Sequence, residues 1–134
     1  MDNKASMTAL MSSFGRAFHA EHEERPVFYD ALAKELMTAE EYAAVGEYIL
    51  GGARFFEPEI DPAAQEPQAL LRRLVNEHIA PSPLCRAAYT ERSLKTAALT
   101  GTKQYVILGA GLDTFALVKR TLYQSTWYLR RIIL

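Results

Sequence analysis

The chain has 134 residues, enough for one modest domain with its own hydrophobic core. Apolar residues make up 49% and charged residues 23%, as in an ordinary globular protein, and a net charge of −1 does not indicate nucleic-acid binding. Cys85 is the only cysteine, which excludes an intrachain disulfide and a cysteine metal cluster. Since the sequence shows no signal peptide and no membrane-length apolar run, we expect a cytoplasmic protein with no membrane or nucleic-acid partner.

The charges are unevenly distributed along the chain. All 16 acidic residues lie at or before Asp113, together with 11 of the 15 basic residues. From Thr114 to Leu134 there are four basic residues and no acidic one. This break in composition falls directly after a glycine-rich turn and needs an explanation.

The N-terminal part predicts helices. Apolar residues recur at helical spacing from Met7 to Phe18, which gives that stretch one apolar face for packing. Arg16 lies off this face, where a charge is ordinarily solvated. Asp30 is suited to cap a second helix over residues 31–37.

Capping patterns mark the next helix and loop. Thr38 and Glu41 have the spacing of a capping box, which predicts a helix ended by Gly51 and Gly52. The three prolines in FFEPEIDPAAQEP then indicate a loop.

Two more helical patterns precede a change of period. PQALLRRLVNEHIAP predicts an amphipathic helix, and we expect Pro81 and Pro83 to break the chain after it. A further helix is predicted to end at Gly101. The run YVIL is continuously apolar and predicts a fully buried central strand. The fold class is therefore α/β, with a helical N-terminal part leading into the first strand of a sheet.

A glycine turn follows this strand. Glycines let a backbone approach a ligand closely, and the helix after such a turn offers free amides. Gly109 and Gly111 provide two glycines, but Thr114 stands where the dinucleotide fingerprint has its third. On its own, the turn is equally consistent with a ligand site and with a tight structural turn.

The sequence around the turn resembles a known family. RAAYTERSLKTAALTGTKQYVILGAGLDTFA is similar to the leucine carboxyl methyltransferase-like family of class I S-adenosylmethionine-dependent methyltransferases. TALMSSFGRAFHA, PVFYDALAKELM and GGARFF resemble the helical N-terminal cap of its bacterial members. The most specific part is ILGAGLDT, and one departure is Ala31, where the family often has proline.

The resemblance implies a Rossmann-like methyltransferase sheet and a site for S-adenosylmethionine. Gly109, Ala110 and Gly111 would lie under the methionine and ribose part of the cofactor. Asp113 and Thr114 would shape the mouth of the turn.

Two arginines complete the implied site. Arg86 matches the family arginine that binds the cofactor carboxylate, a role suited to a rigid guanidinium fork. Without the resemblance, Arg86 would be read as a surface charge on a helix. Arg16 matches the basic residue of the helix that closes over the site. No metal ligands are predicted, and no catalytic residue is assigned.

The implied activity is O-methylation of a carboxylate or of a small-molecule hydroxyl. A carboxylate acceptor is already nucleophilic, whereas a hydroxyl acceptor would need a general base. One strand cannot complete such a site, because an open α/β sheet binds its ligand across several strands. We therefore expect this chain to be an N-terminal fragment that is inactive alone.

The resemblance is expected to stop near Ala116. Residues 1–100 would form the cap and lead-in helix, residues 101–116 the strand and cofactor turn, and residues 117–134 a divergent tail. The tail lacks the acidic residue that should bind the ribose about 20 residues after the turn. We expect a frameshift or a truncated gene model, either of which would explain both this absence and the break in charge.

Two other functions compete with the enzyme. The first is a non-catalytic helical interaction module that self-associates through an exposed sheet edge and the apolar tail residues: Leu122, Tyr123, Trp127, Tyr128, Leu129 and Ile132. The second is a dinucleotide-binding oxidoreductase fragment, which Thr114 disfavours.

Overall fold

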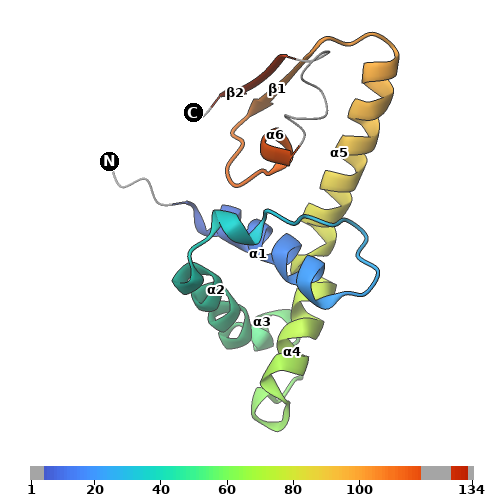
Figure 1. Cartoon of the computed structure of the whole chain (residues 1–134). Coiled ribbons are helices and arrows are strands. Elements are labelled where there is room, and N and C mark those ends of the chain that lie inside the picture. Colours follow the sequence, from blue (N-terminus) through green and yellow to red (C-terminus); the bar gives the residue numbers. More distant parts are fainter. Residues whose placement is uncertain (1–4, 119–127, 133–134) are drawn as a thin grey trace.

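The computed structural model describes residues 5–118 and 128–132. Helices dominate it, and a short parallel sheet lies beside the C-terminal part of the longest helix (Figure 1). The elements are α1 Met7–His22, η1 Lys34–Leu36, α2 Ala39–Gly51, α3 Ala53–Phe56, η2 Pro62–Ala64, α4 Pro67–Leu74, η3 Val75–Ile79, α5 Pro81–Leu99, β1 Gln104–Leu108, α6 Phe115–Val118 and β2 Tyr128–Ile132. Among the described residues, no helix is both long and apolar enough to cross a bilayer.

Helix α1 is the central packing helix that the apolar spacing predicts. Ser6 caps it by accepting a hydrogen bond from the Ala9 amide at 3.2 Å. Phe14 and Phe18 are buried and lie on its apolar face, with ring centroids 5.6 Å apart. The α1 prediction is therefore confirmed.

Helix α2 begins at the predicted capping box. The Thr38 hydroxyl accepts from the Glu41 amide at 3.1 Å, and the Glu41 carboxylate accepts from the Thr38 amide at 2.9 Å. Gly52 ends the helix, as predicted, by donating its amide to carbonyls of the last turn. Both boundaries follow from neighbouring residues only.

The predicted helix over residues 31–37 is wrong. Only the short 3-10 helix η1 forms there, at Lys34–Leu36. The Asp30 carboxylate does not cap it, because this side chain is buried and accepts hydrogen bonds from Arg16 and Thr114 instead. A long-range contact has replaced a local one.

The predicted break at Pro81 and Pro83 is also wrong. Helix α4 continues through the π-helical turn η3 directly into α5, and both prolines lie in the first turn of α5. Proline fits this place because the amides of a first turn have no partner within their own helix. The loop predicted over residues 55–67 includes the last two residues of α3 and the short 3-10 helix η2.

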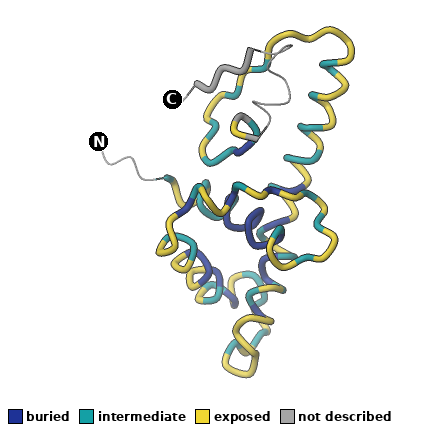
Figure 2. Tube along the Cα trace, viewed as in Figure 1, coloured by how far each residue is buried: buried dark blue, intermediate teal, exposed yellow. Residues whose placement is uncertain are grey.

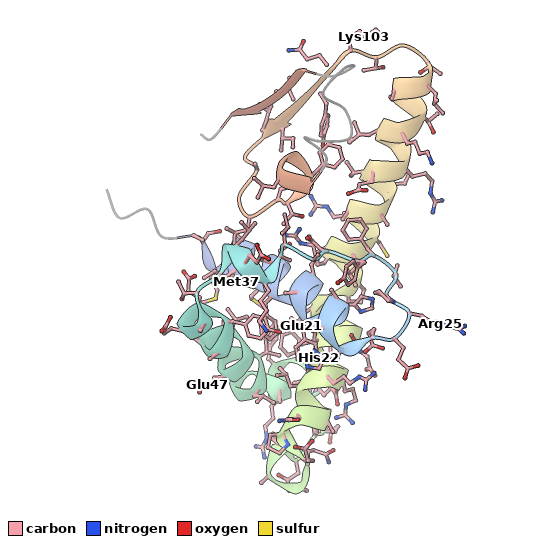
Figure 3. The ribbon with its side chains drawn as sticks, in the orientation of Figure 1. Glu21, His22, Arg25, Met37, Glu47 and Lys103 are labelled. Atoms are coloured by element: carbon pink, nitrogen blue, oxygen red, sulfur yellow. The ribbon has the colours of Figure 1, made fainter. Side chains whose placement is uncertain are left out.

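The hydrophobic core lies within the helical body, which consists of α1 to η3 and the first turn of α5. Buried residues gather where α1 meets α4 and η3, whereas α5 and β1 are mostly exposed or half-buried (Figure 2). The largest fully buried apolar side chains are Phe14, Ile49, Leu74, Val45 and Val75. Charged side chains such as Arg25, Glu47 and Lys103 point outward, away from this core (Figure 3).

Strand β1 is present but is not the buried strand that YVIL predicts. It pairs in parallel with β2, in a register that joins Gln104 to Tyr128 and Leu108 to Ile132. Val106 is 41% exposed and Leu108 67% exposed, because no element among the described residues covers that face. The arrangement fits an incomplete α/β domain with a helical N-terminal part.

Candidate functional site

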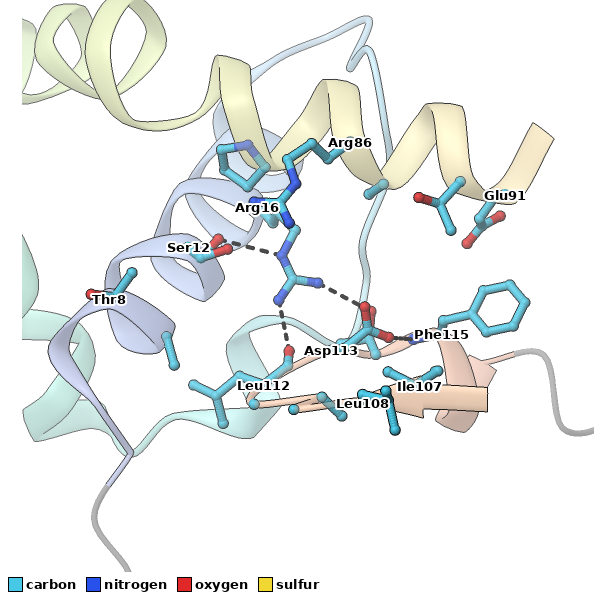
Figure 4. A pocket seen from close by; sticks show the side chains of 18 of the residues that line it. Thr8, Ser12, Arg16, Arg86, Glu91, Ile107, Leu108, Leu112, Asp113 and Phe115 are labelled. Carbon is cyan, nitrogen blue, oxygen red and sulfur yellow. Dashed lines mark hydrogen bonds between the residues drawn. The ribbon is translucent and has the colours of Figure 1, made fainter. Parts of the chain in front are cut away.

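A cavity of about 510 Å³ lies between α1, α5 and the turn that follows β1 (Figure 4). Segments far apart in the sequence form its walls, and all the residues predicted for the site line it: Arg16, Arg86, Gly109, Ala110, Gly111, Asp113 and Thr114. The sequence prediction therefore gathered residues that the fold brings to one place. Their role toward a ligand stays a prediction.

The two glycines of the turn have backbone conformations that favour glycine. Gly109 has φ of +60° and Gly111 has φ of +51°, in the left-handed region. Among the described residues, a Cβ on Gly109 would meet nothing within 4 Å, whereas one on Gly111 would lie 3.7 Å from the Cβ of Ala9, an ordinary van der Waals distance. The turn thus lies close to α1 at Gly111, and the space at Gly109 is open in the described structure.

Asp113 shapes the end of the turn. Its carboxylate accepts a hydrogen bond from the Phe115 amide at 2.8 Å, and its own amide donates to the Ala110 carbonyl at 2.9 Å. The carboxylate therefore lies where α6 begins. This geometry explains why an aspartate follows the second glycine by two residues.

Arg16 is buried, so its reading as a solvated charge is wrong. Its guanidinium donates to Asp30 Oδ2 at 2.5 Å and to the Leu112 carbonyl at 2.6 Å. It also donates to the Thr114 hydroxyl at 3.4 Å and to the Ser12 carbonyl at 3.3 Å. Its charge is neutralised and most of its N–H groups are occupied.

Arg86 differs from Arg16 in its exposure to solvent and in its ion-pair partners. It is exposed on α5, and its side chain extends from the helix toward Arg16 (Figure 4). Among the described residues, no carboxylate forms an ion pair with Arg86. Within the described residues, the cavity thus has one arginine whose guanidinium is bound by the protein and one without an ion-pair partner.

Tyr105 forms part of the wall beside Asp113. Partial burial raises the pKa of its phenol, and the Asp113 carboxylate raises it further. The phenol therefore stays neutral at physiological pH and can donate a hydrogen bond. Its contribution to stability is present below the ordinary tyrosine pKa of 10.0 and is lost as the pH rises through the folded-state value.

Replacing Asp113 by asparagine is expected to lower the pKa of Tyr105. The amide oxygen can still accept from Phe115, but the negative charge is gone. The pKa would be measured by NMR on tyrosine labelled at Cζ, titrated above pH 9 in both proteins. An unchanged Tyr105 titration in Asp113→Asn would show that the carboxylate does not act on the phenol.

Sequence reasoning missed several residues of the wall. Ser12 lies one helical turn before Arg16, and Thr90 lies one turn after Arg86, so a spacing of four residues could have indicated them. Asp30 was recognised only as a helix cap. Nothing in its neighbourhood in the sequence indicates the contact with Thr114.

A separate group of side chains lies on the helical body. Ligand atoms of Glu57, Glu77 and His78 lie within 4.8 Å of one another. Glu57 already forms an ion pair with Arg73 at 2.7 Å. Exposed acidic groups are common without a metal ion, and the ion pair with Arg73 accounts for the position of Glu57.

Comparison with known proteins gives two matches. A model of the leucine carboxyl methyltransferase family matches residues 9–128. The protein YktD of Bacillus subtilis (strain 168) is 39% identical over 114 residues, and its name describes an S-adenosyl-L-methionine-dependent methyltransferase. The alignment covers 84% of this chain but only 38% of YktD. No solved structure matches the chain.

The family match is longer than the sequence motifs predicted. It extends to residue 128, beyond Ala116, where the resemblance was expected to stop. Most of the tail, including Leu122, Tyr123 and Trp127, lies outside the described residues. A frameshift in this tail stays a prediction.

Proposed function

The chain belongs to the leucine carboxyl methyltransferase family, and we propose that its cavity is part of the cofactor site of an S-adenosylmethionine-dependent O-methyltransferase. The acceptor would be a carboxylate or a small-molecule hydroxyl. The chain covers only 38% of its relative, so the activity proposed is that of a complete methyltransferase. We place this protein in the cytoplasm.

The observation that carries the proposal is the pairing of two unlike arginines beside a glycine turn. Arg16 is neutralised by Asp30, whereas Arg86 also lines the cavity and has no ion-pair partner in the part of the chain that the structure describes. A guanidinium binds a carboxylate through two parallel hydrogen bonds. The amino-acid end of S-adenosylmethionine carries such a carboxylate.

The remaining walls fit a cofactor of this kind. A volume of about 510 Å³ lies within the range of about 300–1,000 Å³ that ligand pockets usually have. The open space at Gly109 would let a ligand lie directly against the backbone. The cavity also has hydroxyl groups from Thr8, Ser12 and Thr90, which supply polar contacts.

Methyl transfer requires few chemical roles of the described side chains. The cofactor supplies an electrophilic methyl group on a sulfonium. The protein's contribution is to fix the cofactor, orient the acceptor and exclude water. In this account Arg86 anchors the carboxylate, the glycine turn supports the backbone side of the cofactor, and α1 covers the cavity.

A non-catalytic interaction module is the second candidate. The observation that favours it is the exposed apolar face of β1, with Val106 41% and Leu108 67% exposed. An apolar strand face of this kind is suited to association. This function would need no cofactor.

Calorimetric titrations with S-adenosylmethionine and with NAD distinguish the three functions. We expect S-adenosylmethionine to bind at one site, more weakly than to a complete methyltransferase because the sheet is incomplete, and NAD not to bind. Equal or tighter binding of NAD would favour an oxidoreductase. Absence of both, together with oligomerisation that depends on protein concentration, would favour the interaction module.

A further inference from the structure

We propose that Asp30 and Thr114 are positioning residues, which together with Arg16 lock the glycine turn onto α1. In this arrangement Arg16 is not itself a cofactor ligand. The part of the inference that concerns the cofactor rests on the proposed function. The lock itself does not, because it follows from contacts within the protein.

Asp30 is the centre of the lock. Its side chain is fully buried, and one oxygen, Oδ2, accepts from both Arg16 at 2.5 Å and the Thr114 hydroxyl at 2.7 Å. The other oxygen, Oδ1, is buried and has no hydrogen-bond partner among the residues that the structure describes. Since a buried carboxylate is costly unless paired, Asp30 depends on these two donors.

Arg16 links Asp30 to the turn through hydrogen bonds. While one nitrogen of the guanidinium contacts Asp30, another donates to the Leu112 carbonyl at 2.6 Å. Arg16 comes from α1, Asp30 from the segment between α1 and η1, and Leu112 from the turn. A single planar group thus fixes three segments relative to one another.

Thr114 is the third residue of this cluster and lies at the far end of the turn, where it contacts both Arg16 and Asp30. Its hydroxyl donates to Asp30 and accepts from Arg16, so both of its hydrogen-bonding roles are used. It is 4% exposed. Its backbone carbonyl accepts from the Leu117 amide at 2.9 Å, which ties the hydroxyl to the start of α6.

In this arrangement the two arginines have different roles. Arg16 donates to Asp30, Thr114 and backbone carbonyls, whereas Arg86 has no ion-pair partner among the described residues and is available to bind the ligand. The backbone of the turn would then be held in place before the cofactor binds, which reduces the ordering cost of binding.

The test compares Thr114→Val with Thr114→Ser by hydrogen exchange. Valine has nearly the shape of threonine but no hydroxyl, whereas serine keeps the hydroxyl. We expect the amides of Asp113 and Leu117 to exchange about tenfold faster or more in Thr114→Val, because a hydrogen bond to a charged group is lost. In Thr114→Ser they should stay within about twofold of the parent chain. The Ile49 amide in α2 reports whether the body stays folded.

Cofactor binding is measured on the same proteins. If both variants exchange like the parent at the turn, or both exchange equally fast, the lock is wrong. If only Thr114→Val loosens the turn and also weakens S-adenosylmethionine binding, lock and cofactor role both hold. If it loosens the turn but the parent chain does not bind, the lock holds and the proposed function fails.

The assignment of Arg16 has its own control. Arg16→Lys keeps a positive charge but cannot contact Asp30 and Leu112 together through one planar group. We expect it to loosen the turn as Thr114→Val does. Tight exchange at the turn in Arg16→Lys would show that a point charge is sufficient and would overturn the role given to the guanidinium.

Discussion

Replacing Asp30 by asparagine is expected to lower the free energy of unfolding by about 3–5 kcal/mol, because it leaves the buried Arg16 charge without its counter-ion. The side chains of the pair are only 7% and 0% exposed. Urea unfolding followed by circular dichroism would measure the loss. It is a large part of the stability of a domain, which is typically about 5–15 kcal/mol.

Glu21→Gln is the matched control for this variant. It makes the same change of carboxylate to amide in the ion pair with Lys34, whose side chain is 54% exposed. Exposed pairs contribute about 0–1 kcal/mol, so this loss should be small. Equal losses in Asp30→Asn and Glu21→Gln would contradict the importance given to the buried pair.

A double-mutant cycle tests whether Arg16 and Asp30 stabilise the fold as a pair. Arg16→Met removes the cation, and combined with Asp30→Asn it removes both charges. If the two side chains act as a pair, the double variant should lose clearly less than the sum of the single losses. Additive losses would mean that Arg16 and Asp30 act independently.

Replacing Arg86 by glutamine is expected to weaken binding of S-adenosylmethionine by about 10–100-fold, the range for losing a charged hydrogen bond. The midpoint of unfolding should hardly change, because Arg86 is exposed and forms no ion pair among the described residues. Calorimetric titration measures the first quantity and urea unfolding the second.

Arg92→Gln provides the control for Arg86. Arg92 is exposed on the same helix, α5, but is not among the residues that line the cavity. Its substitution should leave both binding and stability unchanged. If Arg86→Gln and Arg92→Gln weaken binding equally, the effect comes from overall charge and Arg86 is not the carboxylate anchor.

Features that depend on neighbouring residues could be predicted from the sequence. The capping box of α2 is one such feature, and Gly101 is another. Gly101 has φ of +98° and its amide donates to the Ala98 carbonyl, while the Thr102 amide donates to Ala97, as in a Schellman motif. Both boundaries are determined within six residues of chain.

Features that depend on distant residues could not be predicted in this way. Asp30 reads as a helix cap until Thr114, 84 residues away, is brought beside it. Arg16 reads as solvated because the spacing of apolar residues in α1 does not reveal the turn above it. In the structure its guanidinium donates a hydrogen bond to the Leu112 carbonyl, 96 residues away.

The burial of β1 failed as a prediction for a related reason. The run YVIL has the composition of a strand covered on both faces. Coverage depends on neighbouring elements, and in the described residues β2 pairs with β1 at one edge while Val106 and Leu108 stay exposed. By contrast, the residues that the family resemblance implies for the site come from distant parts of the sequence and all line one cavity, because a family motif carries information about a whole fold.

The most direct test is an NMR titration of the ¹⁵N-labelled chain with S-adenosylmethionine. The central claim is that the cavity beside the glycine turn binds this cofactor. We expect the amide signals of Gly109, Gly111 and Asp113 and the side-chain signal of Arg86 to shift, while the Ile49 amide in the core stays in place. If these signals do not move at saturating cofactor, or only signals of the helical body move, the proposed site is wrong.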